Sequence, residues 1–271
     1  MNTPAEIAAN YLAVGKVKVS LSPGRMFLLA VMAGIYIALA GVGASVAPVS
    51  IEPASVAKLV GACLFPAGLT FVLLAGSELF TGNCLLVLPL LQKEIRPGAM
   101  LRSWIIVYAG NFLGSLLIAW AVTAGHTFSL FDNGLAVSAI RTAAAKCSLA
   151  FTDAFLRGVL CNLLVCLAVW ISFAARDVTG KIAGLYFPIL LFVLCGYEHC
   201  VANMYYIPAG LFSLADSGYA QAAAAAGVDT AALSWANFLL CHLLPVTLGN
   251  IVGGTALGAV YWRVYLCKDR R

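Results

Sequence analysis

The sequence predicts an all-α membrane protein with six transmembrane helices, arranged as an inverted repeat of three and three. The first observation is composition: 62% of the 271 residues are apolar and only 10% are charged, against roughly 25% charged residues in soluble domains. The second is a series of long apolar runs, with a mean hydropathy of +0.97, and the third is a polar pattern that occurs twice. Because backbone groups in lipid need internal partners, these runs are expected to be helical.

Six apolar runs are each long enough to cross a bilayer, which takes about 20 helical residues. The second and fifth runs are too long for one straight crossing and contain charged residues, so we expect both helices to be broken near mid-membrane. The six runs cover residues 26–47, 59–91, 104–125, 158–174, 182–214 and 234–266.

The residues outside these runs divide the chain into three parts. Residues 1–25 are mixed and polar, without the apolar segment of a cleavable signal, and predict a short amphipathic helix and a linker broken at Pro23-Gly24. Residues 26–266 are expected to form a single channel domain. Residues 267–271 are expected to form a basic tail.

The basic residues predict the orientation of the helices. With the N-terminus inside, twelve Lys and Arg residues fall on the cytoplasmic side and four fall outside, namely Lys58, Arg141, Lys146 and Arg157. Cytoplasmic loops carry an excess of Lys and Arg. We therefore expect a multi-pass protein of the cell (inner) membrane with both termini in the cytoplasm.

A polar pattern occurs in both overlong runs. The segment from Gly76 to Asn83 and the segment from Gly196 to Asn203 both read G-x-E-x-x-x-x-N, and the run after each one contains G-N-x-x-G, at Gly110 and Gly249. Three helices per half is an odd number, so the two halves must be inverted in the membrane, as in many transporters. Broken backbone at this depth needs a protein interior or a cavity, which predicts that both breaks meet near a pore axis.

His199 is the natural pore residue of the second break. Its imidazole can donate, accept and change charge near neutral pH, and the Thr81 hydroxyl of the first break is able to pair with it. The alternative is a core histidine that caps a broken helix end. Of the other two histidines, His242 is interpreted as a packing residue of the sixth run and His126 as an interfacial residue.

The remaining polar residues of the runs have two interpretations each. Glu78 and Glu198 occupy equivalent positions, and we expect them, with Asn83 and Asn203, to be structural, the carboxylates accepting the backbone N–H groups freed at the breaks. The alternative for the two glutamates is a direct contact with the substrate. Lys146 either attracts anions into the pore or is an ordinary interfacial lysine. Two further residues, Asn162 and Asn250, either line the pore or bond helix to helix.

Several other function classes are disfavoured. Nine cysteines without a C-x-x-C pair, and histidines without helical pairing, give no metal or haem site and no cofactor. A hydrolase would need a nucleophile elbow, and Gly-x-Ser-x-Gly is missing, so we expect no enzyme and no catalytic residues. Basic residues at the ends of runs are membrane anchors, not a nucleic-acid site. A water or glycerol channel remains the alternative, although the sequence contains no Asn-Pro.

Five segments resemble one family. They are GSELFTGN from Gly76, NFLG from Asn111, RGVLCNLLVCLAVW from Arg157, GYEHCVANM from Gly196 and LGNIVGG from Leu248. Together they resemble the formate/nitrite transporter family over essentially the whole chain. GSELFTGN is more similar to the nitrite and hydrosulfide branches of that family.

The resemblance implies an aquaporin-like fold, a homopentamer in membrane lipid, and one pore in each protomer for a small monovalent anion. It further implies functional positions and narrow points along that pore. The implied functional residues are His199, Thr81, Lys146, Asn162 and Asn250, and the implied apolar constrictions are Leu79, Phe80 and Phe192.

An energetic comparison predicts how such an anion crosses an apolar constriction. Carrying the bare charge costs several kcal/mol, whereas protonating a carboxylate with a pKa of about 4 at pH 7 costs roughly 4 kcal/mol. Neutral transit therefore competes with transit of the anion. Our hypothesis is that Lys146 draws the anion in, His199 and Thr81 bind it, and a proton reaches it from His199 or through water.

Overall fold

The computed structural model describes residues 1–267, which fold into helices with no β-strand among them. The helical segments long and apolar enough to span a membrane are Pro23–Val46, Ala54–Gly76, Pro97–Ala124, Phe151–Ser172 and Asn237–Tyr265. The shorter apolar helices Val178–Leu194 and Cys200–Ala215 together occupy the predicted fifth run. The predicted basic tail, except for Cys267, lies outside the described residues.

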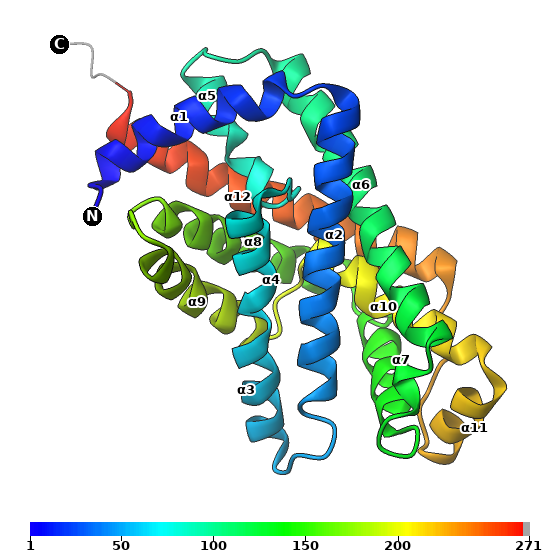
Figure 1. Ribbon diagram of the computed structural model, residues 1–271. Helices are drawn as coiled ribbons and strands as arrows, with labels where there is room; N and C mark the ends of the chain where they lie inside the picture. The colour runs from blue at the N-terminus through cyan, green and yellow to red at the C-terminus, as the bar shows by residue number, and fades with distance from the viewer. Residues whose placement is uncertain (268–271) are drawn as a thin grey trace.

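The N-terminal helix is present and packs against the body of the protein. Helix α1 (Pro4–Ser20) begins with a capping box in which Thr3 and Glu6 bond to each other, and the Thr3 backbone N–H and hydroxyl lower the pKa of Glu6 from its ordinary value. Its inner face is buried, and the helix lies across one end of the molecule (Figure 1). Pro23 starts α2 (Pro23–Val46) instead of breaking a linker, because proline suits the first helical turn.

The second apolar run is broken as predicted. Helices α3 (Ala54–Leu64) and α4 (Pro66–Phe71) continue into a π-turn, η1 (Val72–Gly76), and the backbone is not helical again until the 3₁₀ turn η2 (Gly82–Leu86) and helix α5 (Val87–Leu91). Gly76 has a φ of +81°, which glycine adopts without steric cost. The helix therefore stops at this residue.

The fifth run is broken in the same way. Helix α9 (Val178–Leu194) ends before Gly196, whose φ is +69°, and α10 begins four residues later (Cys200–Ala215). A glycine in the left-handed region thus starts both breaks, as the repeated G-x-E pattern predicts.

Some helices begin earlier than the hydropathy indicates. Helix α6 (Pro97–Ala124) starts at a proline, and α8 (Phe151–Ser172) starts seven residues before the predicted fourth run, so Arg157 lies within a helix. The polar stretch before α8 also contains a helix, α7 (Gly134–Cys147), that packs against α10. The remaining elements are η3 (Thr127–Ser129), α11 (Ser217–Ala225), the π-turn η4 (Asn237–Leu243) and α12 (Leu244–Tyr265).

Two helix pairs form the tightest contacts of the fold, α2 with α6 and α8 with α12. In both pairs a glycine of the G-N-x-x-G segment lies against the backbone of its partner. A Cβ at Gly114 would overlap the carbonyl oxygen of Val31, and a Cβ at Gly253 would overlap that of Val159. Small residues allow this close approach in membrane helices, so the second repeated motif is a packing motif.

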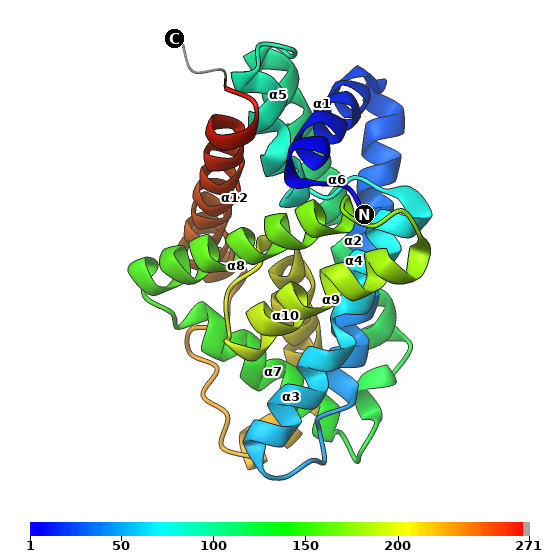
Figure 2. The same cartoon turned by 90° about the vertical axis from the view of Figure 1, so that its left-hand side faces the viewer.

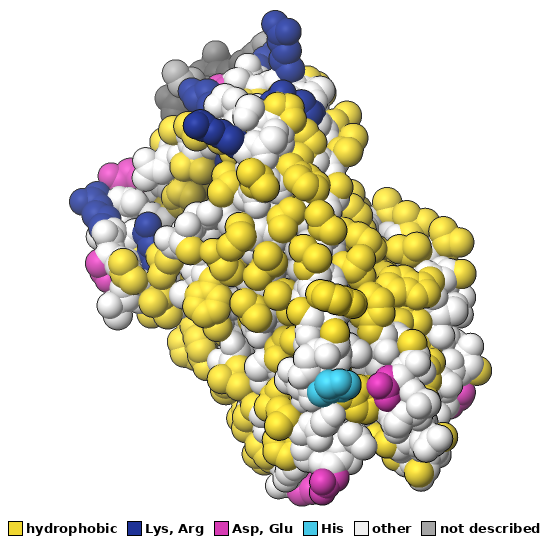
Figure 3. Space-filling view, turned by 45° about the vertical axis from the view of Figure 1, so that its right-hand side comes forward, with side chains coloured by type: hydrophobic (Ala, Val, Ile, Leu, Met, Phe, Trp, Pro, Cys, Tyr) yellow, Lys and Arg dark blue, Asp and Glu magenta, His cyan; other side chains and the backbone are white. Residues whose placement is uncertain are grey.

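The surface shown in Figure 3 is largely apolar across its middle, and the charged side chains gather toward its ends. Helix α1 and the end of α12 lie on the same side of the molecule in both ribbon views (Figures 1 and 2), and they contact each other. The connections after α2 and α6 lie on the opposite side. Both ends of the described chain therefore face the same way.

The glycine contacts give a first prediction. Gly114→Ala forces α2 and α6 apart and is expected to cost about 1–3 kcal/mol, the usual cost of overpacking. Gly43→Ala is the matched control, because a Cβ at Gly43 meets nothing within 4 Å. Thermal unfolding in detergent, followed by size-exclusion chromatography, measures both. Equal midpoints for the two variants would contradict the proposed packing role.

Candidate functional site

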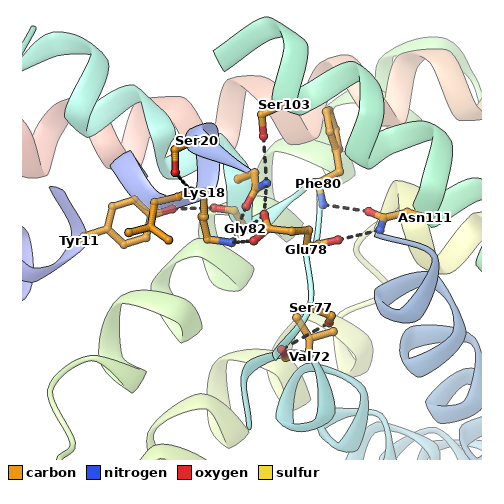
Figure 4. A network of polar contacts seen from close by, with 12 residues as sticks. Tyr11, Lys18, Ser20, Val72, Ser77, Glu78, Phe80, Gly82, Ser103 and Asn111 are labelled. Atoms are coloured by element: carbon orange, nitrogen blue, oxygen red, sulfur yellow. Dashed lines mark hydrogen bonds and ion pairs between the residues drawn. The ribbon is translucent and has the colours of Figure 1, made fainter. Parts of the chain in front are cut away.

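A single asparagine of α6 holds the first break. The Asn111 side-chain oxygen accepts the Phe80 backbone N–H at 2.9 Å, and its Nδ2 donates to the Glu78 carbonyl at 2.9 Å (Figure 4). Nδ2 also donates to the Ala30 carbonyl at 2.7 Å. Asn111 is fully buried. One side chain thus satisfies both kinds of backbone group that the break leaves free.

Asn250 of α12 holds the second break with the same set of bonds. Its oxygen accepts the Cys200 backbone N–H at 2.9 Å, and its Nδ2 donates to the Gly158 carbonyl at 2.8 Å and the Glu198 carbonyl at 2.9 Å. The repeated G-N-x-x-G pattern therefore supplies one backbone clamp to each break.

The Glu78 carboxylate of the first break binds a lysine. Lys18, near the end of α1, donates to both Glu78 oxygens at 2.9 Å and to the Asn83 side-chain oxygen at 3.0 Å, and Asn83 Nδ2 donates to Glu78 at 2.8 Å. Ser103 lies 3.4 Å from the same Asn83 nitrogen. Lys18, Glu78, Asn83 and Ser103 form the first polar network, and Figure 4 labels Lys18, Glu78 and Ser103.

The Glu198 carboxylate of the second break also binds a lysine. Lys146, in the last turn of α7, donates to Glu198 Oε2 at 2.7 Å, and Asn203 Nδ2 donates to the same oxygen at 2.8 Å. Asn203 Nδ2 is also 2.8 Å from His242 Nε2. This second polar network matches the first at every position, with His242 in the place of Ser103.

These contacts correct two expectations. The prediction that Glu78 and Glu198 accept the freed backbone N–H groups is wrong in detail, since the two asparagine clamps accept them and the carboxylates bind lysines. Lys146 is neither a free interfacial lysine nor an unpaired pore charge. It is in an ion pair, and its ammonium lies 5.7 Å from the centre of the Tyr206 ring.

The protein contains two hollows that reach toward opposite ends of α2. One has a volume of about 970 Å³ and includes Ala44 in its wall. The other measures about 390 Å³ and includes Leu29. Fifteen helical residues separate these two positions, or about 22 Å along the helix.

The larger hollow, which we call the basic hollow, is positively charged. Four basic side chains and two carboxylates line it, leaving an excess of two positive charges if all are ionised. The basic side chains are Lys58, Arg141, Lys146 and Arg157, and the carboxylates are Glu52 and Glu198. All four basic residues assigned to the outer side from the sequence therefore line one hollow. The smaller hollow, covered by Tyr11 of α1, contains one ion pair, Lys18 with Glu78.

A thin barrier separates the two hollows. Phe65, which caps α4, lines the basic hollow, and Leu69 of α4 lines the smaller one, only about 6 Å further along the helix axis. Phe192 lines the basic hollow and Leu79 the smaller one, and all four side chains are buried. The Phe192 ring contacts Phe65 edge-on at 5.5 Å between centroids.

His199 and Thr81 join the two breaks at this barrier. His199 Nε2 lies 2.8 Å from the Thr81 hydroxyl, as expected from the sequence, and both side chains are buried. His199 Nδ1 accepts the Ala202 backbone N–H at 3.0 Å, which caps α10. Since Nδ1 is an acceptor, the ring proton lies on Nε2, which donates to Thr81. His199 is therefore both the predicted pore-side residue and the helix cap of the alternative interpretation.

The other residues singled out in the sequence occupy different places. Asn162 donates to the carbonyls of Thr81 and Asn250, at 3.2 and 2.6 Å, so it and Asn250 bond helix to helix. Leu79 and Phe192 lie at the barrier, whereas the Phe80 ring packs against Trp104 and Tyr108 of α6.

Sequence reasoning missed three polar residues of the two networks, namely Lys18, Ser103 and His242. Lys18 was counted as one of several membrane anchors. Regular spacing is the signal that could have found them. Lys18 precedes Ala30 by twelve residues, as Lys146 precedes Gly158, and Ser103 precedes Asn111 by eight, as His242 precedes Asn250.

Membrane-spanning helices, two opposed hollows and two broken helices that meet between them define an integral membrane transport protein. The family described as formate/nitrite transporter matches residues 5–263. A probable formate transporter of Methanothermobacter thermautotrophicus is 36% identical over 97% of each chain. The formate channel FocA of Escherichia coli K12 is 34% identical over 98% of this chain and 95% of its own.

A solved structure described as a pentameric formate channel with formate bound superimposes with a TM-score of 0.80. It is 36% identical in sequence, and the match covers 90% of this chain and 98% of that one. The chain belongs to the formate/nitrite transporter family, a family of channels and transporters. The names of these relatives refer to formate, and none of the three refers to hydrosulfide.

The first polar network gives a second prediction. Lys18→Met leaves the buried Glu78 carboxylate without its cation, and breaking such a pair costs about 3–5 kcal/mol. Lys16→Met is the matched control on the same helix, because the Lys16–Glu94 pair is exposed and such pairs contribute about 0–1 kcal/mol. Thermal unfolding is measured for both.

The double variant Lys18→Met with Glu78→Gln isolates the interaction. It is expected to be more stable than Lys18→Met alone, since no buried charge is left unpaired. A double variant as unstable as the sum of both single changes would show that the pair contributes nothing as a pair.

Proposed function

We propose that this protein conducts small monovalent anions of weak acids, with formate as the leading substrate, by a passive or proton-linked route. The observation that carries the proposal is the contact between Thr81 and His199, at the barrier between a positively charged hollow and a smaller one. The names of the formate channel and transporter relatives support the substrate class.

The proposed architecture is an inverted repeat of two three-helix halves, with an aquaporin-like plan and six crossings. The matching clamps and networks at equivalent positions support this arrangement. We further propose a homopentamer with one pore in each protomer, supported by the pentameric state of the similar formate channel. The excess of basic residues on the side of both ends supports cytoplasmic termini in the inner membrane.

The basic hollow is the proposed entry for the anion. Its excess positive charge raises the local concentration of anions, as charged clefts do. Lys146 contributes to this field although it is paired with Glu198, because it stays partly exposed to the hollow. Next along the path, the His199 Nε2–H holds the Thr81 oxygen, so that the Thr81 hydroxyl hydrogen and the N-terminus of α10 present positive dipole ends to the anion.

The geometry favours water over His199 as the immediate source of the proton. A neutral imidazole cannot readily give up its Nε2 proton, and Nδ1 already accepts the Ala202 N–H. His199 would have to lose this cap before it could take up a second proton. The anion therefore gains a proton that water in the hollow relays from the bulk solvent, which leaves the relaying water neutral, while His199 and Thr81 orient the anion. The neutral acid then passes Phe192 and Leu79.

The alternatives predict different solute profiles. A water or glycerol channel needs no net charge at its entry, which makes the basic hollow unnecessary. Hydrosulfide and nitrite share the charge and small size of formate, and the GSELFTGN segment from Gly76 keeps them as secondary candidates.

A swelling assay gives the third prediction. Proteoliposomes are placed in isotonic formate, nitrite, hydrosulfide or glycerol, and swelling is followed by light scattering. We expect formate to enter much faster than into protein-free liposomes and glycerol to enter at the protein-free rate. Rapid entry of glycerol without formate would support the water-channel alternative instead.

The pH dependence of formate flux gives the fourth prediction. His199→Asn removes the Nε2–H that orients the Thr81 hydroxyl toward the anion. Hydrogen bonds to charged groups contribute about 1.5–3 kcal/mol, so uptake is expected to fall at least about tenfold when that orientation is lost. If water supplies the proton, the pH profiles of wild type and variant keep the same shape. A change in shape would assign the proton transfer to His199 itself.

A further inference from the structure

The second polar network contains a titratable residue that the mechanism above does not use. His242 lies in the π-turn η4 and is completely buried. Pro245 has no N–H to donate to the carbonyl four residues earlier, which explains why the helix widens into a π-turn here. This turn places His242 against Asn203 and 3.5 Å from Glu198 Oε2.

The bonds around Asn203 determine which nitrogen of His242 carries the proton. Asn203 Nδ2 has two hydrogens, one directed to Glu198 Oε2 and the other to His242 Nε2, both at 2.8 Å. His242 Nε2 is therefore an acceptor, and the neutral ring carries its proton on Nδ1. Nδ1 has no hydrogen-bond partner among the described residues, and neither has the Asn203 side-chain oxygen.

The two networks differ in how firmly they hold their lysines. Lys18 makes three hydrogen bonds, two to Glu78 and one to the Asn83 oxygen. Lys146 makes one, to Glu198 Oε2, in the wall of the basic hollow. The two lysine side chains are about equally exposed, at 20% for Lys18 and 18% for Lys146, so the difference lies in the number of hydrogen bonds. The network with the histidine is thus the one whose lysine is more easily released.

Protonation of His242 changes the balance of charge around Glu198. A proton on Nε2 would face the Asn203 N–H, so the imidazolium N–H turns to the Glu198 carboxylate, whose Oε2 lies 3.5 Å away. Glu198 then has two cations for one negative charge. Of these two, only Lys146 has access to water, and it can turn into the hollow while remaining near the Tyr206 ring.

We propose that His242 is a proton-responsive positioning residue, which acts through Glu198 to control how far the Lys146 ammonium reaches into the basic hollow. Its effect on transport rests on the proposed function. Acid would then add positive charge to the entry on this side. In the first network Ser103 occupies the equivalent place and cannot be protonated in this way.

The helices that pack against η4 are α7, α8, α10 and α12, and they carry further charged and titratable groups. Lys146 is the one joined to His242, through Glu198. The remaining groups on these helices are Arg141 and Cys147 of α7, Asp153, Arg157, Cys161 and Cys166 of α8, Cys200, Tyr205 and Tyr206 of α10, and Tyr261, Arg263 and Tyr265 of α12. Their effects are separated from that of His242 by the variants below.

The fifth prediction is tested first by NMR of the wild-type protein in nanodiscs with ¹⁵N-labelled histidine. The chain has three histidines, so comparison with His242→Asn assigns the signal. Spectra are recorded from about pH 8 to about pH 5, and we expect a bare Nε2 with a protonated Nδ1 at the alkaline end and two protonated nitrogens at the acid end. Glu198→Gln is expected to alter this transition, because it removes the carboxylate 3.5 Å from Nε2. A ring whose signals do not change over this range would overturn the proposal.

The second readout is the ratio of formate uptake by wild type to that by His242→Asn across the same pH range. We expect this ratio to change about fivefold, the effect of one unit charge about 4 Å away in water, with the midpoint seen by NMR. Ser103→Ala removes the equivalent contact of the first network, and its ratio to wild type should not depend on pH. If His242→Asn fails to assemble by size-exclusion chromatography, His242→Gln replaces it.

A ratio that stays constant with pH would overturn the proposal even if His242 titrates. Failure of the proposed function looks different, since wild type would then carry no formate at any pH. In that case the NMR transition of His242, and its shift in Glu198→Gln, still decide whether the second network responds to protons.

Discussion

The whole site depends on satisfying the backbone of two helices that stop inside the membrane. An N–H or C=O without a partner in lipid costs several kcal/mol, and each break frees several. Asn111 and Asn250 meet this constraint, each accepting one N–H and donating to two carbonyls. Because each clamp also ties its break to the helix of a neighbouring run, the non-helical segments are held in one position, and the side chains of Thr81 and His199 can meet.

The same constraint explains the glycines and the lysines. Each clamp can reach across a helix pair only if the two backbones are very close, which Gly114 and Gly253 allow. The carboxylates in the breaks are then too deep to remain charged alone. A cation on a long side chain meets this need from the nearest polar surface, from α1 in one half and α7 in the other. The N-terminal helix is thus tied to the first break by an ion pair as well as by packing.

How much of this was predictable follows from how local each signal is. The two breaks were predictable, because each lies in an apolar run that is too long for one crossing and has a glycine and a glutamate in its middle. The pairing of Thr81 with His199 was predictable, because the repeat places one of them in each break. The ion-pair partner of Glu78 was not predictable, since Lys18 lies sixty residues earlier in the sequence, among lysines typical of membrane anchors. Helix α7 was missed because its polar residues, Arg141 and Lys146, interrupt the apolar pattern, although its small apolar residues pack against α10.

In the proposed mechanism, function is concentrated where the two proposed halves differ. The clamps, carboxylates and lysines are repeated, and what is repeated serves the fold. Leu79 in the first half stands where His199 stands in the second, and Ser103 stands where His242 stands. The hollows differ in the same sense, one with an excess of basic side chains and one with a single ion pair. A symmetric pore would treat a proton alike from both sides, whereas both of these histidines lie next to the basic hollow or to the carboxylate in its wall. We therefore expect the rate of transport to depend on the proton concentration on the side of the basic hollow.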